Sequence, residues 1–382
     1  MRTDLTRRSL IAWATLACGW VPPAHAENGV DAQSIVIGQS LSLQDGANDY
    51  AVAAAEGIQA WLRKVNARGG VHGRQLVLRT LDDRNQAATA QANARQLIGQ
   101  DKVFLLFGSI EGGPSTAVME AAVEAGVPFF GPMAGSPGLR RPFQPLVFPV
   151  RAEHREEFRA LLTYARNTGA KRVGFFRADS GVGLQHLENV RILCQDLGLE
   201  LVADLPFKSD TPPAQIEQMA QRIRSTQTQV VINHGSASMY EKLVRATLAQ
   251  GYRNVFYGVN SGSTQIARHL GPLARGMVFA QIVPSPWERK TALARAYQDD
   301  MARAFPGREF SYGSLEGYVT ARALVQALDR AGPGPTRASF LAGLQNASFD
   351  IEGLPVRYTP QEHAGLSLVD LSVVDRDGRF RH

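Results

Sequence analysis

The sequence predicts an α/β protein that contains two doubly wound, parallel-sheet lobes. Short runs rich in β-branched residues alternate with amphipathic stretches of helical period, a pattern typical of βαβ units with right-handed crossovers. The same rhythm restarts after Pro149, which indicates that one architectural unit is used twice. At 382 residues, with 44% hydrophobic and 20% charged residues, the chain is long enough for two lobes that each bury a core.

The first half is predicted to alternate strands at 34–38, 76–78, 103–107 and 127–130 with helices at about 48–68, 87–99 and 115–124. The first of these helices has an apolar face, and Gly69-Gly70 provides its stop signal. That apolar face consists of Ala51, Ala54, Ile58, Leu62 and Val65.

The second half is predicted to alternate strands at 172–176, 199–205, 230–232 and 254–257 with helices at about 183–197, 213–225 and 239–250. Two lobes of similar size imply a cleft between them. Ligands of open α/β sheets bind at the carboxyl ends of the strands, so we expect the loops that follow the strands to line this cleft.

Residues 1–26 are interpreted as a signal peptide. Three arginines precede a short apolar stretch at 10–21, and Ala24-His25-Ala26 offers the small residues that signal peptidase needs, so cleavage is expected after Ala26. Arg7-Arg8 also fits a twin-arginine route. The alternatives are a buried N-terminal helix, which Pro22-Pro23 disfavours, and a lipoprotein anchored at Cys18, whose preceding residues fit poorly.

Charge and cysteine usage exclude some functions. The formal charge is +6, but the basic residues occur as isolated pairs rather than as a stripe with aromatic residues, so no nucleic-acid partner is expected. Once residues 1–26 are removed, Cys194 has no intramolecular partner. Its place in an apolar helical stretch favours a buried thiol over a nucleophile.

Signatures of catalysis are absent from the sequence. We find no phosphate-binding loop, no dinucleotide fingerprint and no nucleophile elbow. The eight histidines are scattered without metal-ligand spacing. Asp82-Asp83 could bind a cation, but a polar strand end is the favoured reading. We therefore expect no catalytic residue, no metal and no cofactor, although a catalytic site can assemble from distant residues.

Loops rich in Gly, Ser and Asn follow the predicted strands, and several lead directly into a helix. Free backbone N–H groups and the positive end of the helix dipole suit a carboxylate there, although these residues are also ordinary turn and cap residues. The loops are 40–42, 108–113, 134–136, 179–181, 233–236 and 260–262.

The stretch Gly69-Gly70-Val71-His72-Gly73-Arg74-Gln75-Leu76-Val77-Leu78, followed by Asp82-Asp83, resembles a signature of one family. It is similar to the leucine/isoleucine/valine-binding group of type I periplasmic solute-binding proteins of ABC transporters. Further matches follow in order at 125–128, 180–183 and 314–318, so the resemblance covers essentially the whole mature chain.

The resemblance implies a periplasmic monomer that captures a small solute by hinged lobe closure and delivers it to an ABC permease in the inner membrane. Three crossovers, near Pro149, Val283 and Gly353, would divide the chain into one lobe of 27–150 plus 283–354 and another of 151–282 plus 355–382. A last strand at 368–374 would return to the second lobe. A periplasmic sensor that presents the solute to a receptor is the alternative, and a cleft enzyme is a weaker one.

The resemblance also implies a set of ligand-binding residues. Position by position these are Tyr50, Ser109, Gly112, Ala134, Gly135, Ser136, Ser180, Ser236 and Asn260. Three positions depart from the family pattern, because Ser180 and Ser236 replace tyrosines and Asn260 replaces the acidic residue that holds the ligand ammonium.

These departures predict weak binding of leucine, isoleucine and valine, since a desolvated ammonium needs an opposite charge. Glu111 could supply that charge from the other lobe, and a surface position for it is an equal alternative. The solute expected from sequence is therefore a small carboxylate, an amide, an amino acid or an aromatic acid.

Overall fold

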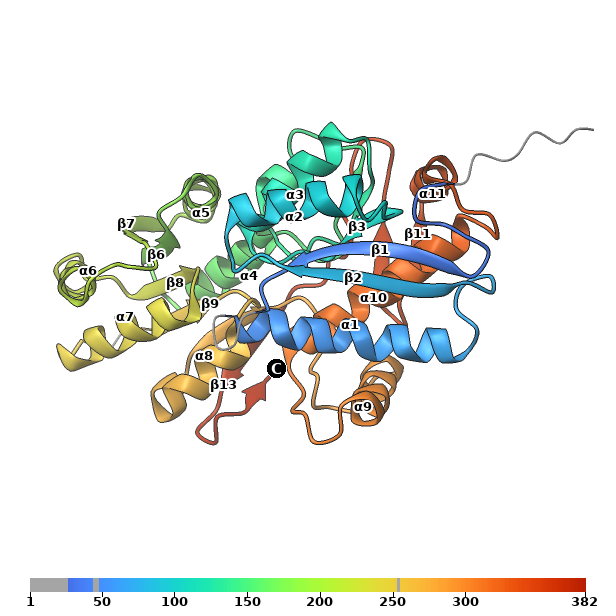
Figure 1. The fold of residues 1–382 in the computed structure, drawn as a ribbon. Helices are drawn as coiled ribbons and strands as arrows, with labels where there is room; N and C mark the ends of the chain where they lie inside the picture. The colour runs from blue at the N-terminus through green and yellow to red at the C-terminus, as the bar shows by residue number, and fades with distance from the viewer. Residues whose placement is uncertain (1–26, 44–47, 253–254) are drawn as a thin grey trace, which may run out of the picture.

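The computed structural model describes residues 27–43, 48–252 and 255–382; the signal-peptide features all lie outside these ranges. Its strands form a five-stranded sheet in the order β2-β1-β3-β4-β5, a seven-stranded sheet in the order β14-β13-β10-β9-β8-β6-β7 and a hairpin, β11-β12. We call the five-stranded sheet with its helices the first lobe, and the seven-stranded sheet with its helices the second lobe. They lie at opposite ends of the view in Figure 1.

The strands of the first sheet are β1 (Ser34–Leu41), β2 (Gln75–Asp82), β3 (Leu105–Phe107), β4 (Phe129–Phe130) and β5 (Val147–Phe148). Those of the second sheet are β6 (Arg172–Ala178), β7 (Glu200–Phe207), β8 (Val230–His234), β9 (Val255–Gly258), β10 (Val278–Gln281), β13 (Asp370–Val374) and β14 (Phe380–Arg381). The hairpin consists of β11 (Ser348–Asp350) and β12 (Pro355–Arg357).

The helices up to the end of the second parallel unit are α1 (Asp49–Ala67), α2 (Ala87–Gly99), α3 (Gly112–Glu124), α4 (His154–Asn167), α5 (Gly181–Leu197), α6 (Pro213–Ser225), α7 (Ala237–Ala249) and α8 (Ser263–Leu270). The later helices are α9 (Ala292–Ala304), α10 (Tyr312–Arg330) and α11 (Arg337–Leu344), and the short 3-10 helices are η1 (Pro137–Leu139) and η2 (Gly271–Ala274).

The first sheet is parallel throughout and is covered on both faces, as parallel sheets are. Helices α2 and α3 pack on one face, and α1 and α10 pack on the other (Figure 1). The backbones of α1 and α10 touch through two glycines: a Cβ atom on Gly57 would come within 1.8 Å of the Ser314 carbonyl oxygen, and one on Gly317 within 2.1 Å of that of Ala54. Close approach of this kind requires glycine.

The second sheet repeats this plan. Its strands β7-β6-β8-β9-β10 are parallel and follow the same relative order as β2-β1-β3-β4-β5. Helices α4 and α5 pack on one face, and α6, α7 and α8 on the other. This confirms the prediction of one doubly wound unit used twice.

After β10 the chain returns to the first lobe, forms α9, α10 and α11, and re-enters the second sheet through β13, which is antiparallel to β10. The return of the last strand is therefore confirmed. Directly after the hairpin β11-β12, Tyr358 packs against Phe130 and Phe148 of the first sheet, and the chain pairs with the second sheet from Asp370 onward. The crossings at 149–151 and 365–366 lie side by side, because Leu366 N donates to Val150 O at 2.7 Å.

Most predicted elements are confirmed, and α2 has the predicted bounds. The sequence analysis missed α4, α8, α9 and α11 and the short strands β5, β10, β11, β12 and β14. Among the described residues, no helix is both long and apolar enough to cross a membrane.

Candidate functional site

The two lobes touch where α3 and α5 begin. A Cβ atom on Gly112, the first residue of α3, would lie 2.6 Å from Ser136 Oγ in its own lobe and 2.9 Å from Val182 Cγ1 in the other lobe. Asp49 and Arg268 form a further ion pair across the interface, at 3.1 Å. The structure is thus a closed arrangement of the lobes.

A buried ionic cluster lies between the lobes, at the crossing that follows β5. Arg151, whose side chain is 1% exposed, donates to Glu157 of α4 and lies 3.6 Å from Oε1 of Glu316 on α10. It also donates to Ser261 Oγ, in the loop after β9, at 3.1 Å. Three separate parts of the chain therefore converge on one guanidinium.

Tyr50 and Asn260 complete this cluster. The Tyr50 hydroxyl donates to Glu316 Oε2 and accepts from the Asn260 side-chain amide at 3.4 Å, and the same amide donates to Glu316 Oε2 at 2.8 Å. The backbone N–H of Asn260 donates to Glu157 Oε2 at 2.7 Å. Two of the predicted site residues are thus in direct contact, across the lobe interface.

The cluster contains two carboxylates and one guanidinium. Burial raises the pKa of both Glu157 and Glu316, while the nearby Arg151 acts in the opposite direction. The pKa of Arg151 is raised: burial acts against its charge, but Glu316 and Glu157 outweigh that effect. Among the described residues, Glu316 Oε1 and Asn260 Oδ1 are buried acceptors without a hydrogen-bond partner. Glu316 Oε1 still lies in the ion pair with Arg151, at 3.6 Å, so both atoms are acceptors that retain capacity for a further hydrogen bond.

The loops of the first lobe form the facing wall. Ser109 Oγ donates to Ser115 Oγ at 2.8 Å, whereas the buried Ser136 Oγ has no partner among the described residues. Glu111 accepts from the Asn48 side chain at 3.2 Å, and burial raises its pKa. It belongs to this wall but not to the Arg151 cluster.

The neighbouring carboxylates Asp82 and Asp83 are held by local hydrogen bonds. Asp83 accepts from Ser40 and Ser42, at 3.1 and 2.6 Å, and Asp82 accepts from the backbone N–H of Leu43 at 3.1 Å. Their side chains close a strand-end turn, as the favoured reading expected, but α2 has no side-chain cap from either.

The remaining predicted residues lie around the interface without entering the cluster. The Ala134 carbonyl accepts from Arg140 at 3.4 Å, and the Gly135 carbonyl accepts from the backbone N–H of His154 at 3.1 Å. Ser180 and Ser236 are exposed and cap α5 and α7, accepting from the backbone N–H of Gly183 and Met239. In the closed structure these two serines are therefore helix caps at the rim of the interface.

Three histidines that are far apart in sequence come together in the second lobe. One nitrogen from each of His154, His186 and His234 lies within 4.8 Å of the others. The prediction that the histidines are scattered is therefore wrong for these three, because α4, α5 and β8 bring them together in the fold.

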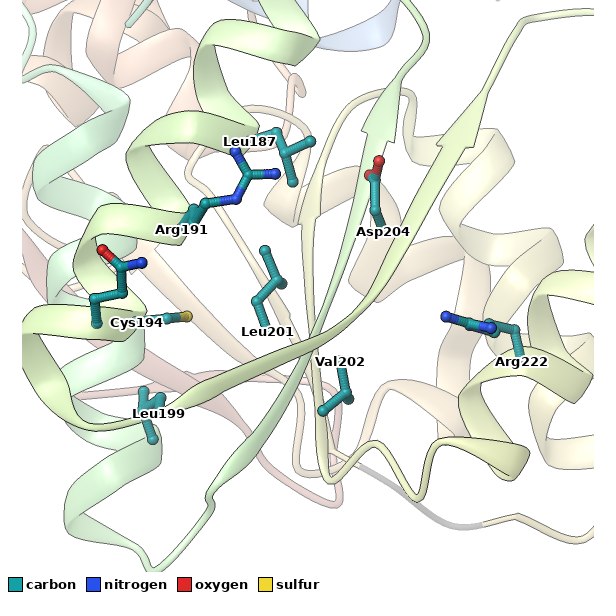
Figure 2. A pocket seen from close by; sticks show the side chains of 9 residues that line it. Leu187, Arg191, Cys194, Leu199, Leu201, Val202, Asp204 and Arg222 are labelled. Carbon is teal, nitrogen blue, oxygen red and sulfur yellow. The ribbon is translucent and has the colours of Figure 1, made fainter.

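A separate cavity of about 400 Å³ lies on the outer side of the second lobe, between α5, β7 and α6 (Figure 2). Its lining includes Arg191, Cys194, Asp204 and Arg222, none of which belongs to the lobe interface. Cys194 is free and buried, as predicted, and burial raises the pKa of its thiol to about 12. The cavity offers no activated nucleophile.

A family model described as "Periplasmic binding protein" matches residues 34–379, which is nearly the whole described chain. This chain belongs to the periplasmic binding protein family. The family consists of solute-binding proteins of the periplasm, and the type I fold and the leucine/isoleucine/valine-binding resemblance predicted from sequence are confirmed.

Individual relatives agree with this assignment. The "Leu/Ile/Val-binding protein homolog 7" of Brucella abortus (strain 2308) is 38% identical over 79 residues, a match that spans 20% of this chain and only 19% of the relative. A possible leucine/isoleucine/valine-binding protein from Rhodopirellula baltica SH 1 superposes with a TM-score of 0.84 at 26% identity, over 92% of this chain and 97% of the other. An ABC transporter substrate-binding protein from Desulfitobacterium hafniense, in complex with Leu, shares the fold, with a TM-score of 0.75 at 18% identity over 91% and 99% of the chains.

In this periplasmic binding protein the central charged residues are ones that sequence reasoning missed. Arg151 and Glu157 flank the start of the unpredicted helix α4. Glu316 lies within the family match at 314–318, but nothing in its spacing distinguishes it from a surface carboxylate. The available signal was its place in the first part of α10, 312–321, which carries no other charge, and there an isolated charge indicates a buried partner.

Proposed function

We propose that this protein is the solute-capture component of a periplasmic ABC importer, exported as a monomer with cleavage after Ala26, and that its solute carries both a carboxylate and an amino group. The observation that carries the proposal is the pair of buried acceptors without a hydrogen bond at the lobe interface, Asn260 Oδ1 and Glu316 Oε1, the second of which lies 3.6 Å from Arg151. The lobes close about the crossings at 149–151 and 365–366 and near Val283, as hinged solute-binding proteins do.

The amino end of the solute fits the Arg151 cluster. An ammonium has three N–H donors and one positive charge. Glu316 Oε1 and Asn260 Oδ1 can accept two of its hydrogen bonds, and its charge balances the second carboxylate of the cluster. Without a cation, two buried carboxylates share one guanidinium, and burial of the unbalanced charge is costly.

The carboxylate end fits the first-lobe wall. The first backbone N–H groups of α3 have no acceptor within the helix, and the helix dipole favours an anion there. Ser136 Oγ, next to Gly112, adds a hydroxyl donor without a partner among the described residues. The candidate carboxylate-binding residues are therefore Ser109, Gly112 and Ser136, with Ala134 and Gly135 shaping the loop.

This proposal departs from the expectation of weak amino-acid binding. That expectation assumed that no carboxylate accompanies Asn260, but Glu316 lies 2.8 Å from its amide. Glu316, rather than Glu111, is the counter-charge that we propose. Ser180 and Ser236 enclose the side chain of a bound amino acid less than tyrosines would. The candidate solutes are therefore amino acids at least as large as valine.

Isothermal titration calorimetry tests the proposed class of solute, with each amino acid compared with the 2-oxo acid of the same side chain. We expect valine, leucine or phenylalanine to bind more tightly than the corresponding 2-oxo acid. In Glu316→Gln, which keeps the shape and removes the charge, amino-acid affinity should fall about 30- to 5,000-fold, the equivalent of about 2 to 5 kcal/mol. The oxo acid should change much less.

Glu111→Gln is the control for the amino end, because Glu111 lies outside the cluster, and it should leave the preference for the amino acid intact. Equal binding of both members of every pair, or equal loss in both variants, would overturn the proposed solute class.

Uptake distinguishes importer from sensor. Deletion of the gene in its host should abolish uptake of the labelled solute at low concentration, and the wild-type gene should restore it. Normal uptake with a lost transcriptional response would instead assign the chain to a sensory pathway.

A further inference from the structure

We propose that His154, His186 and His234 form a binding site for one transition-metal ion of the zinc class, beside the solute site and independent of the identity of the solute. The site lies within the second lobe. It uses three imidazoles and leaves one coordination position for water or for a bound molecule.

The fold brings the three rings together from three elements. His154 begins α4, His186 lies in the middle of α5, and His234 ends β8. The ring centroids of His186 and His234 are 3.9 Å apart, those of His154 and His234 are 4.5 Å apart, and those of His154 and His186 are 5.3 Å apart. A tetrahedral ion with Zn–N bonds of about 2.0–2.1 Å needs nitrogens roughly 3.4 Å apart. The three nitrogens are at most 4.8 Å apart, so shifts of about 1 Å at the ring edges suffice.

Three of the ring nitrogens in this cluster have no hydrogen-bond partner among the described residues. Both ring nitrogens of His186 and Nδ1 of His234 are buried and have no hydrogen-bond partner among the described residues. His186 itself is fully buried. Buried polar atoms are rarely left unpaired, and each costs about 1–3 kcal/mol, so unpaired nitrogens on two adjoining rings indicate a missing partner. A cation that accepts one lone pair from each imidazole is such a partner.

Glu157 supplies the outer-sphere contact typical of metal-bound histidine. Its Oε1 lies 2.8 Å from His154 Nδ1, closer than the Arg151 guanidinium at 3.5 Å, so the shorter contact favours a proton on Nδ1 and Nε2 as the ligand atom. Glu157 also binds Arg151 and the backbone N–H of Asn260, so the proposed metal site and the solute site share this carboxylate. Figure 1 shows α4 between the two lobes, where such sharing is possible.

The charges around the rings favour neutral imidazoles. Burial lowers the pKa of His154 and His186 well below the usual value and that of His234 to about 4, and the Arg151 guanidinium adds to this effect. A neutral imidazole is the form that binds metal. Arg151 and Arg140 also oppose a metal cation, and the Glu157 carboxylate, which lies 2.8 Å from His154 Nδ1, offsets them.

The donor set determines the class of metal. Three imidazole nitrogens suit zinc, copper and nickel, whereas calcium and magnesium prefer oxygen ligands. His234 is only partly buried and gives an entry path, while the other two rings are enclosed.

Metal titration of the chelator-stripped protein tests the proposal. We expect one Zn²⁺ per chain by native mass spectrometry, a dissociation constant of about micromolar or tighter by calorimetry, and a tetrahedral visible spectrum with Co²⁺. His186→Phe, which fills the same space without a ligand atom, should weaken Zn²⁺ binding at least about 100-fold, since even loss of an outer-sphere partner costs 10- to 100-fold.

Two further variants keep the result interpretable. His269→Gln removes an exposed histidine outside the cluster and should bind Zn²⁺ as the wild type does. Glu157→Gln should weaken binding about 10- to 100-fold while the tetrahedral Co²⁺ spectrum persists, because Glu157 positions His154 and does not ligate.

Folding is monitored separately, by circular dichroism and thermal melting in the presence of chelator. His186→Phe removes two unpaired nitrogens and should melt no lower than the wild type; if it does not fold, His234→Phe replaces it. Absence of Zn²⁺ binding, an octahedral Co²⁺ spectrum, or unchanged affinity in a folded His186→Phe or His234→Phe protein would each overturn the proposal.

Discussion

The side-chain amide of Asn260 donates to Glu316 Oε2 at 2.8 Å, and both residues are fully buried. Asn260 follows β9 of the second lobe, whereas Glu316 lies on α10, which packs against the first sheet. This contact is one of those that join the lobes, and it leaves one acceptor on each residue without a hydrogen bond. The interface is therefore held by polar groups that also have capacity for a solute.

Gly112→Ala should impair closure without unfolding the lobes. The new Cβ atom would meet Ser136 Oγ at 2.6 Å and Val182 Cγ1 at 2.9 Å, and Val182 belongs to the opposite lobe. Alanine favours the helix that begins here, so stability should be maintained. We expect at least about tenfold weaker solute binding, which is about 1.4 kcal/mol, and no solute-induced fall in the radius of gyration by small-angle scattering.

Gly113→Ala is the matched control, because its Cβ atom would meet only Ala87 Cβ, at 4.0 Å. Equal behaviour of the two variants would show that the contact with Val182 does not limit closure.

Tyr50→Phe should destabilise the solute-free protein by about 2 kcal/mol. The lost hydroxyl donates to the buried Glu316 carboxylate, and hydrogen bonds to charged groups contribute about 1.5–3 kcal/mol. Urea denaturation at pH 7 measures the change. Tyr252→Phe, which removes a hydroxyl bound to the neutral Thr228 carbonyl oxygen at 2.9 Å, should cost less; a larger loss there would contradict this account of Glu316.

His363 should make the protein less stable as the pH falls below neutrality. Its ring stacks on Phe148 at 4.1 Å beside the crossing at 149–151, and burial lowers its pKa below the usual value of about 6.5. Below that pH the unfolded chain binds a proton that the native chain does not, so stability is lost as the pH decreases, by at most about 1.4 kcal/mol per pH unit.

Denaturation curves at pH 7 and pH 5 should therefore differ less in His363→Gln than in the wild type. The exposed His269→Gln variant should keep the wild-type difference. A His363→Gln protein with an unchanged pH dependence would rule out this histidine as a contributor.

Cys194 should resist modification in the folded protein. Burial raises the pKa of its thiol to about 12, so very little thiolate exists at pH 8 even though the thiol lines the cavity in Figure 2. Maleimide labelling, followed by mass mapping of the peptide that contains Cys194, should be slow in buffer and rapid in denaturant. Rapid labelling under native conditions would show that the cavity opens readily around α5.

The sequence predicted the repeating architecture because local periodicity determines it. The helix at 87–99 is recovered with its bounds, since Ala90, Ala94 and Leu97 repeat at helical spacing against the sheet. Strand β5 has only two residues, too few to show an alternating pattern. Helix α4 was not predicted because its start, 153–157, is dense in charged residues and resembles a polar loop.

The site was only partly predictable for the same reason. Tyr50 and Asn260 were found through the resemblance, and they are indeed in contact. Their shared partner Glu316 is 56 residues from Asn260, and the histidine cluster joins residues from α4, α5 and β8. Such pairings depend on how the elements pack, which no local pattern encodes.

The glycine-mediated contact of α1 with α10 has a kinetic consequence. The apolar face of α1 is made early in synthesis, yet the helix that covers it begins only at Tyr312, after the entire second parallel unit. Contacts of such large sequence separation slow folding. A nascent chain therefore leaves this face of its first sheet half-covered until most of the polypeptide has been synthesised.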